Sequence, residues 1–558
     1  MTDHQNYTLS ETSKLVGFLC LILLGNLEVC TRGCAQGRCS MQQETPLGEQ
    51  RSALWGTPRW WIGLLVGVGG FVGILLLPPL PVFQEAVVAI GTAREHVVPV
   101  TLSVQRVLAL LCLMSWWWVG EVVPLPVTAL LPALVGPLLS LVRLHEGELQ
   151  AMPLRSFVQG YADPIVLLFL GSFILAEALR EYGIDRRWAL LLLSRRWVTR
   201  SPRRLVLSIM VATAVTSMWM NNTATAAMLM PVVVGIFNRL QRYPTKAPLQ
   251  RLGMALALGV AWASSIGGMM TVVGTAPNGI AVGVLRQQGI EVSFLRWLQY
   301  GIPVGMVLLI IGWLVLVARI HLPWQELRAV RGYIVEEYRQ LPPLDAAAWR
   351  VLLVVGSVVS AWLFVPFLAL WFPVLRGVDV WNIALAGGIA LFLIPASQRR
   401  GALLSWQAAQ RIDWGTLLLF GGGLSLSGLL VESKAAVVLT HVLTAEAVHI
   451  PPLLAMALLL LAGNFATELI SNTALASLLL ALIVPFLKAL GIPVEPAIIA
   501  LAMVTSCAFM LPVATPPNAI AYATRLFSLP AMMRVGIWMN LLATFVLVGL
   551  VQLAWAVR

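Results

Sequence analysis

Long apolar blocks, separated by short polar stretches rich in arginine, dominate the chain. Several blocks approach or reach the roughly 20 residues that a helix needs to span a bilayer. They are Trp60–Leu77, Leu102–Val123, Val127–Val142, Ile302–Val317, Val351–Phe372 and Ile537–Val557. A helix that is buried all round shows no single apolar stripe, so periodicity says little inside these blocks. The pattern predicts an all-α polytopic membrane protein with about eleven spanning or re-entrant segments.

The composition agrees with this prediction. Of the 558 residues, 59% are hydrophobic and 11% are charged, whereas soluble domains carry about 25% charged residues. The 45 glycines and 33 prolines also fit, because both residues are commoner in membrane helices than in soluble ones. An ordinary soluble enzyme is therefore excluded.

The net charge of +12 does not indicate a nucleic-acid partner, because the arginines form no single patch. They lie between the apolar blocks, as the positive-inside rule describes for cytoplasmic loops. The arginine-rich stretches that we assign to the cytoplasm, together with the N-terminus, are 180–204, 239–251, 328–339 and 399–411.

This topology requires two segments to enter and leave the membrane on one side. We predict a first re-entrant hairpin at 205–238 and a second, entering from the opposite side, at 451–487. The predicted organisation is a cytoplasmic tail (1–58), a first membrane half (59–321), a cytoplasmic loop (322–346) and a second membrane half (347–558). Part of the tail precedes the native start if translation begins at Met41.

Cysteines and histidines give no sign of a metal or catalytic site. Cys20, Cys30, Cys34 and Cys39 have the spacing C-x9-C-x3-C-x4-C without histidines, which matches no common zinc pattern. The six histidines lie outside the predicted hairpin tips and pair with no nucleophile, so we do not expect an enzyme. A membrane sensor would need an attached soluble signalling domain, for which the tail and the 322–346 loop leave little sequence.

An internal repeat runs through the two halves. Asp163 precedes Asn222 by 59 residues, and Asp413 precedes Asn472 by the same interval. The asparagines lie in Asn221-Asn-Thr223 and Ser471-Asn-Thr473, and each half has a later Thr-x-Pro-Asn, at 275–278 and 515–518. If the arginine topology holds, the halves are inverted, which is the plan of many secondary transporters with a midplane site. The alternative is that these small polar residues only pack helices, which the matched positions disfavour.

Broken segments of this kind offer groups for both an anion and a cation. Helix N-termini suit a carboxylate or sulfate, and unwound carbonyls and side-chain oxygens suit Na⁺. Asn222 and Asn472 offer a donor and an acceptor each. The tips of the two predicted hairpins and the two Thr-x-Pro-Asn segments contain no Lys or Arg. The charge of a bound anion would therefore have to be offset by helix dipoles and by cations bound beside it. This favours cation coupling.

Three acidic residues near these motifs have simpler interpretations. Glu468, beside the second tip, is either a functional ionisable group within the membrane or a structural acceptor for nearby backbone N–H groups. Asp163 and Asp413 each precede an apolar block and are most simply helix N-caps.

These motifs together resemble those of the divalent anion/sodium symporter family over roughly residues 60–555. The segments that carry the resemblance are Asn222-Thr-Ala-Thr-Ala-Ala, Gly274-Thr-Ala-Pro-Asn278, Asp413-Trp-Gly with Phe420-Gly-Gly-Gly423, Ser471-Asn-Thr473 and Ser506–Asn518. The resemblance implies a homodimer whose protomers each have a scaffold domain and an elevator-like transport domain with two opposed hairpins.

The resemblance also implies site residues. Substrate contacts would come from Asn221, Asn222, Thr223, Thr275, Ser471, Asn472, Thr473, Thr515 and Pro516. The first Na⁺ site would use Ser217, Asn221, Asn222 and Gly274. The second would use Thr467, Asn472 and the carbonyls of Ile470 and Ala514. Asn221 departs from the family's serine, which narrows the pocket on that side and puts substrate size and the first Na⁺ site in question.

The expected function is import of a small divalent anion by Na⁺ symport across a plasma or bacterial inner membrane. A C4-dicarboxylate such as succinate, malate or fumarate is the expected substrate. Sulfate or tricarboxylate uptake and Na⁺-independent dicarboxylate exchange stay open as alternatives. The expected partners are the anion, the bilayer and a second copy of the chain, with no nucleic acid.

Overall fold

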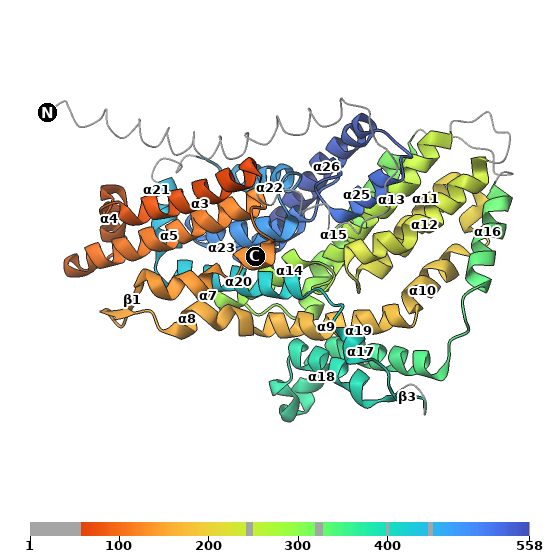
Figure 1. The fold of residues 1–558 in the computed structure, drawn as a ribbon, viewed down its shortest axis with the longest axis horizontal. Coiled ribbons are helices and arrows are strands. Elements are labelled where there is room, and N and C mark those ends of the chain that lie inside the picture. Colours follow the sequence, from red (N-terminus) through yellow and green to blue (C-terminus); the bar gives the residue numbers. More distant parts are fainter. Residues whose placement is uncertain (1–56, 242–248, 319–326, 398–400, 445–449, 557–558) are drawn as a thin grey trace. The chain divides into compact units, whose positions relative to one another are not determined.

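The computed structural model describes residues 57–241, 249–318, 327–397, 401–444 and 450–556 (Figure 1). The predicted tail and its four cysteines therefore lie almost wholly outside the described residues. The chain divides into two compact units, Met1–Ile62 and Gly63–Arg558, and the packing below is that of the second. Two small antiparallel pairs accompany the helices: β1 (Val142–His145) with β2 (Glu148–Ala151), and β3 (Pro395–Ser397) with β4 (Gly401–Ala402).

By length and composition, nine helical segments among the described residues could cross a membrane. They contain α5 (Val97–Gly120), α9 (Pro164–Glu181), α12 (Asn222–Gln241), α13 (Leu249–Met270), α15 (Phe294–Val317), α17 (Ala346–Trp371), α20 (Trp414–Glu432), α23 (Asn472–Ala489) and α26 (Leu529–Ala556). The bent pair α3 (Pro58–Leu76) and α4 (Pro81–Ala89), with 65° between its helices, makes up to ten. The polytopic all-α prediction is confirmed.

The sequence-based number was about eleven because it also counted interrupted segments. Residues 124–142 form α6 (Leu125–Thr128), α7 (Leu131–Val135) and the 3₁₀ turn Gly136–Leu139. Pro126, Pro132 and Pro137 each remove a backbone donor from this stretch, which prevents one continuous helix. Three further apolar helices are also too short to span alone, namely α18 (Val380–Leu393), α22 (Pro452–Ala466) and α24 (Val494–Thr505).

Each segment predicted as a hairpin is a helix, a short break and a second helix. In 205–238, α11 (Pro202–Ser217) and α12 flank residues 218–221. In 451–487, α22 and α23 flank residues 467–471. The loop predicted at 322–346 contains α16 (Leu327–Arg339), which packs on α12.

A broken helix follows each hairpin. After α13 the chain unwinds until α14 (Ala276–Gln287), and after α24 it unwinds until α25 (Pro516–Ala523). Thr275 and Thr515 precede these helices in extended conformation, with φ of −148° and −143°. Proline at the start of each helix fits there because the first helical N–H groups have no partner in the helix.

The order of elements is the same in both halves. An Asp-capped helix, a short helix, a hairpin, a broken helix and a long helix follow one another. In the first half they are α9, α10 (Ile184–Leu193), α11–α12, α13–α14 and α15. In the second they are α20, α21 (Ala435–Thr444), α22–α23, α24–α25 and α26. The Asp163 carboxylate accepts from Ile165 N at 2.9 Å and that of Asp413 from Thr416 N at 3.0 Å, so both are N-caps. The internal repeat is confirmed.

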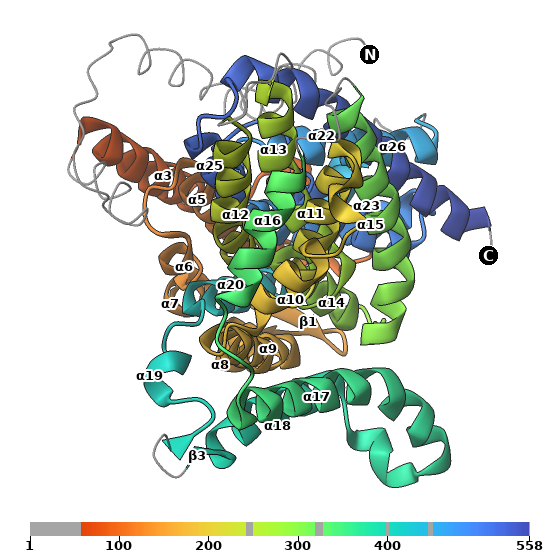
Figure 2. The ribbon, with the colours of Figure 1, turned by 90° about the vertical axis from the view of Figure 1, so that its right-hand side faces the viewer.

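The helices of the second unit pack as two groups. The hairpin bundle consists of α11–α15 and α22–α26, which pack on one another. The flanking group contains α5–α7, α8 (Leu154–Val158), α9, α17, α18, α20 and α21. Figures 1 and 2 both show α17 and α18 beyond α9, away from α11–α13. The groups meet mainly where α23 packs against α20 and α21 and where α14 packs against α20.

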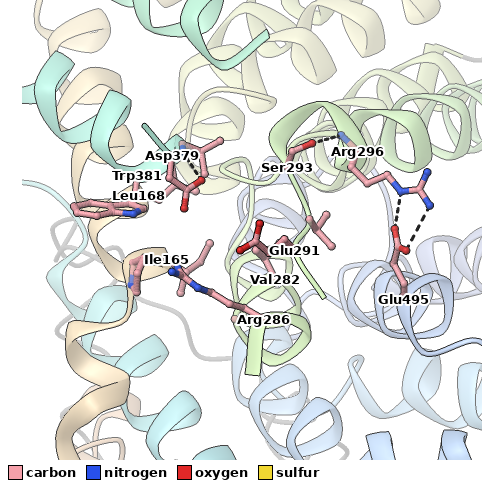
Figure 3. Close-up of a pocket in the computed structure, with 14 residues that line it drawn as sticks. Ile165, Leu168, Val282, Arg286, Glu291, Ser293, Arg296, Asp379, Trp381 and Glu495 are labelled. Atoms are coloured by element: carbon pink, nitrogen blue, oxygen red, sulfur yellow. Dashed lines mark hydrogen bonds and ion pairs between the residues drawn. The ribbon is translucent and has the colours of Figure 1, made fainter. Parts of the chain in front are cut away.

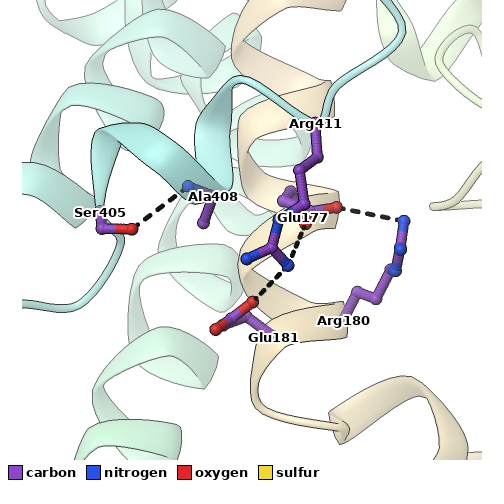
Figure 4. A network of polar contacts seen from close by, with 6 residues as sticks. All are labelled: Glu177, Arg180, Glu181, Ser405, Ala408 and Arg411. Carbon is purple, nitrogen blue, oxygen red and sulfur yellow. Dashed lines mark hydrogen bonds and ion pairs between the residues drawn. The ribbon is translucent and has the colours of Figure 1, made fainter.

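An ionic network joins the end of α9 to the segment that leads into α20 (Figure 4). Arg411 Nη1 lies 3.1 Å from Glu181 Oε2 and 3.7 Å from Glu177 Oε1, and Arg180 Nη1 lies 3.4 Å from Glu177 Oε2. The Glu177 side chain is only 6% exposed. A carboxylate this buried needs its cations, since unpaired buried charge is costly.

We expect Arg411→Gln to destabilise the folded protein by about 1–3 kcal/mol, because Glu177 is left with Arg180 alone. The measurement is the melting temperature of the purified protein in detergent. Arg376→Gln, at an exposed position, is the matched control and should leave the melting temperature unchanged. Equal melting temperatures for the two variants would show that the network contributes nothing.

Candidate functional site

In the first half, the two ends of the break are tied together by Ser217 and Asn222. The Ser217 hydroxyl lies 2.7 Å from Asn222 Oδ1 and 2.7 Å from the carbonyl oxygen of Ser264 on α13. Ser217 is fully buried. A serine hydroxyl has one hydrogen to donate, so Ser217 can donate to only one of these two acceptor oxygens at a time.

The second half repeats the arrangement. The Thr467 hydroxyl lies 2.7 Å from Asn472 Oδ1 and 2.6 Å from the carbonyl oxygen of Thr505 at the end of α24. Thr467 is also fully buried. Two buried oxygen clusters therefore occupy equivalent places in the repeat, and each has one hydroxyl hydrogen for two acceptors.

Glycine allows the first cluster to form. A Cβ atom at Gly268 would lie 2.3 Å from Asn222 Oδ1, and one at Gly274 would lie 2.4 Å from the Gly268 carbonyl oxygen. Both distances are too short for any side chain. Gly268 near the end of α13 therefore lies directly against the Asn222 amide, and Gly274 lies against Gly268. Through Gly268, the predicted sodium-site residues Ser217, Asn222 and Gly274 are close to one another.

The Thr-x-Pro-Asn asparagines bind the unwound backbone. Asn278 Nδ2 donates to the carbonyls of Gly268 (3.0 Å) and Thr271 (2.6 Å). Asn518 Nδ2 donates to those of Ala508 (3.0 Å) and Leu511 (3.0 Å). Both residues belong to the matched motifs at 275–278 and 515–518, but no role was predicted for either from the sequence. The available signal was that both occupy the last position of the Thr-x-Pro-Asn motif in their half of the repeat.

The remaining predicted site residues lie at the starts of the same helices. Asn221 is exposed, and its Oδ1 accepts from Thr223 N at 2.8 Å, so it caps α12. Thr515 is buried, and its hydroxyl accepts from Asn518 N at 3.3 Å. The residues whose part in a common pocket stays a prediction are Thr223, Thr275, Ile470, Ser471, Thr473, Ala514 and Pro516.

The two halves interleave at this point. The helix that begins at Asn222, α12, packs against α25 of the second half, and the helix that begins at Asn472, α23, packs against α14 of the first. The second helix of each hairpin thus contacts the helix that follows the Thr-x-Pro-Asn break of the other half. Four helix N-termini belong to this arrangement, and such N-termini attract anions through free N–H groups and the helix dipole.

Glu468 follows Thr467 and is 3% exposed. Its Oε1 accepts from Phe509 N (2.7 Å), Met510 N (2.9 Å) and Asn540 Nδ2 (2.8 Å), and its Oε2 accepts from Leu511 N (2.9 Å). Of the two interpretations that the sequence left open, the structure shows the acceptor for backbone N–H groups.

Comparison with known proteins places these features in a family. The family profile described as the sodium:sulfate symporter transmembrane region matches residues 94–557. The chain belongs to the divalent anion/sodium symporter family. With its apolar helices, family membership makes it an integral membrane protein.

Proteins similar to this chain include two that are named sodium-dependent dicarboxylate transporter SdcS. That of Staphylococcus saprophyticus is 32% identical over 451 residues, covering 79% of this chain and 84% of its own length. That of Staphylococcus aureus strain USA300 is 32% identical over 454 residues, with the same coverage. Among solved structures, the YdaH transporter of Alcanivorax borkumensis matches with a TM-score of 0.49 at 15% identity, over 79% of this chain and 97% of that one.

A cavity of about 380 Å³ lies apart from the oxygen clusters of Ser217 and Thr467 (Figure 3). It opens where the starts of α9 and α18 meet the end of α14, and none of the predicted substrate or sodium residues lines it. Its charged residues are mixed in sign: Arg286, Glu291, Arg296, Asp379 and Glu495. Arg296 is held by Glu495, with Nε 2.7 Å from Oε1. The acidic groups outnumber the arginines, so this cavity does not suit a dianion.

Proposed function

We propose that the protein is a secondary active transporter that imports a small dicarboxylate, such as succinate, malate or fumarate, together with Na⁺. The observation that carries this proposal is the surplus of oxygen acceptors around Ser217 and Thr467. Each hydroxyl lies within 2.7 Å of two acceptor oxygens and satisfies one of them with its hydrogen. The oxygen left without this hydrogen would coordinate a small cation, as backbone carbonyls beside broken helices do in other transporters.

The anion would bind without a fixed cation of the protein. The breaks at 218–221 and 467–471 contain no Lys or Arg. Helix N-termini, the amide groups of Asn222 and Asn472, and bound Na⁺ would supply the favourable interactions. Such a site binds its anion well only when the cation is present, which is the physical basis of coupling.

A dicarboxylate is favoured over the alternatives by the relatives, which are named sodium-dependent dicarboxylate transporters. Sulfate or tricarboxylate uptake and Na⁺-independent exchange are the competing functions. The proposal includes a transporter with no enzymatic activity, a homodimer and an elevator-like movement of the hairpin bundle along α20 and its neighbours. It also includes a cytoplasmic N-terminus, with the first hairpin entering from the cytoplasm.

Uptake of labelled succinate into proteoliposomes tests this proposal. We expect an inward Na⁺ gradient to accelerate uptake at least about tenfold over an equal K⁺ gradient, because Na⁺ completes the anion site. Sulfate and citrate, added in excess, should compete more weakly than malate and fumarate. Uptake that ignores Na⁺ but requires internal dicarboxylate would show exchange instead, and stronger competition by sulfate would show a sulfate transporter.

Asn221→Ser tests the departure from the family's usual triplet. Serine can still cap α12, so the melting temperature should be unchanged. Because the smaller side chain widens the pocket, we expect citrate to compete with succinate several-fold better than in the unchanged protein. Competition curves for citrate against labelled succinate measure this. Superimposable curves, with the same Na⁺ dependence, would mean that residue 221 does not limit substrate size.

A further inference from the structure

The two halves of the repeat differ at the residue that follows the buried hydroxyl. Ser217 is followed by Met218, and Thr467 is followed by Glu468. Met218 has an apolar side chain, and its backbone carbonyl accepts a hydrogen bond from the hydroxyl of Thr271, just after α13, at 2.5 Å. Glu468 offers the second break a carboxylate.

This difference matches a difference in helix length. Helix α13 continues to Met270, eight residues before Asn278, whereas α24 ends at Thr505, thirteen residues before Asn518. The second half therefore lacks more than one helical turn that the first half has. Its backbone N–H groups at residues 509–511 donate to the carboxylate of Glu468 instead. The carboxylate thus replaces helical hydrogen bonds and opens the backbone beside Thr467.

The carboxylate is surrounded by donors. Three backbone N–H groups and the Asn540 amide all donate to it. A protonated carboxyl would have to donate to an acceptor, whereas an anion accepts from all four. Glu468 therefore brings a fixed negative charge to the second cluster, and Met218 brings none to the first.

We propose that Glu468 makes the cation site at Thr467 and Asn472 the tighter of the two. It acts as a positioning residue, because it braces residues 509–511 and holds a negative charge on the side chain of the residue next to Thr467. A unit charge within about 10 Å of a bound cation, at an effective dielectric constant of about 20, changes the cation affinity by about tenfold. The inference rests on the proposed Na⁺ coupling.

The test compares Glu468→Gln with Met218→Gln in the purified full-length protein. The first variant removes the charge with little change of shape, and the second places the same neutral side chain at the matched position. One readout is the Na⁺ concentration that gives half-maximal thermal stabilisation without substrate, since a ligand of the folded state raises its apparent stability. The other readout compares two quantities from uptake, the Na⁺ concentration for half-maximal uptake and the KM for succinate at saturating Na⁺.

We expect Glu468→Gln to raise the Na⁺ concentration for half-maximal stabilisation at least about tenfold, with the succinate KM at saturating Na⁺ within about threefold of normal. Met218→Gln should leave the tighter Na⁺ site unchanged. Glu468→Asp keeps the charge and should stay within about threefold of the original Na⁺ affinity. It is the deciding variant if Glu468→Gln does not fold.

Two results would overturn the inference. One is a Glu468→Gln protein with an unchanged Na⁺ titration, and the other is a Glu468→Asp protein that needs about tenfold more Na⁺. A starting protein that shows no Na⁺ dependence at all would instead contradict the proposed function, so the two failures are distinguishable.

Discussion

Replacing Asn472 with alanine is expected to abolish Na⁺-driven succinate uptake, and Asn222→Ala is expected to do the same. Each change removes the Oδ1 atom that lies 2.7 Å from the buried hydroxyl of Thr467 or Ser217. It also removes the side-chain amide at the first residue of α12 or of α23. Losing a buried polar partner costs about 1–3 kcal/mol, and here the proposed cation and anion both lose a contact, so we expect uptake to fall at least about 100-fold.

Initial uptake rates at equal amounts of reconstituted protein measure this loss. Asn238→Ala is the matched control, because Asn238 is exposed near the other end of α12. The control should transport normally, and all three variants should melt within a few degrees of the original protein. Normal succinate uptake by either Asn222→Ala or Asn472→Ala would refute a site built from both halves.

Gly268→Ala is expected to produce the second-largest loss, although it adds only a methyl group. Helix propensity alone favours the change, since alanine is better than glycine in a helix interior by roughly 0.5–1 kcal/mol. However, the new Cβ would lie 2.3 Å from Asn222 Oδ1, and the amide cannot withdraw without leaving Ser217. We therefore expect a normally folded protein whose uptake falls at least about tenfold, because the first oxygen cluster is displaced.

The control for this prediction is Gly356→Ala on α17, where an added Cβ meets nothing within 4 Å. Its uptake should equal that of the original protein. The distinguishing measurement is the Na⁺ dependence of uptake in the two variants. If Gly268→Ala transports with unchanged Na⁺ dependence, the contact between α13 and Asn222 has no functional importance.

The sequence was sufficient to predict the parts of the site that repeat. Asn222 and Asn472 stand out because each lies the same distance after a capping aspartate, and the structure pairs them with Ser217 and Thr467. The other acceptors, the carbonyl oxygens of Ser264 and Thr505, could not be predicted. Every residue has a backbone carbonyl, so only the three-dimensional path of the chain decides which one faces a hydroxyl.

The close contact between Gly268 and Asn222, and the packing of helices from one half against those of the other, could also be found only in the structure. Gly268 looks like an ordinary small residue of a membrane helix, and its importance follows only from its distance to Asn222. The packing of α12 on α25 and of α23 on α14 is tertiary and leaves no mark on hydropathy. The same limit applies to the apolar block Val127–Val142, which its composition presents as one near-spanning segment and which prolines divide into short helices.

The most direct test of the central claim, that dicarboxylate and Na⁺ move together, is uptake of labelled Na⁺ driven by succinate. Proteoliposomes with equal Na⁺ inside and outside would receive an inward succinate gradient. The proposed function predicts that labelled Na⁺ accumulates inside above its external concentration, and that Asn472→Ala abolishes the accumulation. Entry of succinate without movement of labelled Na⁺ would contradict it.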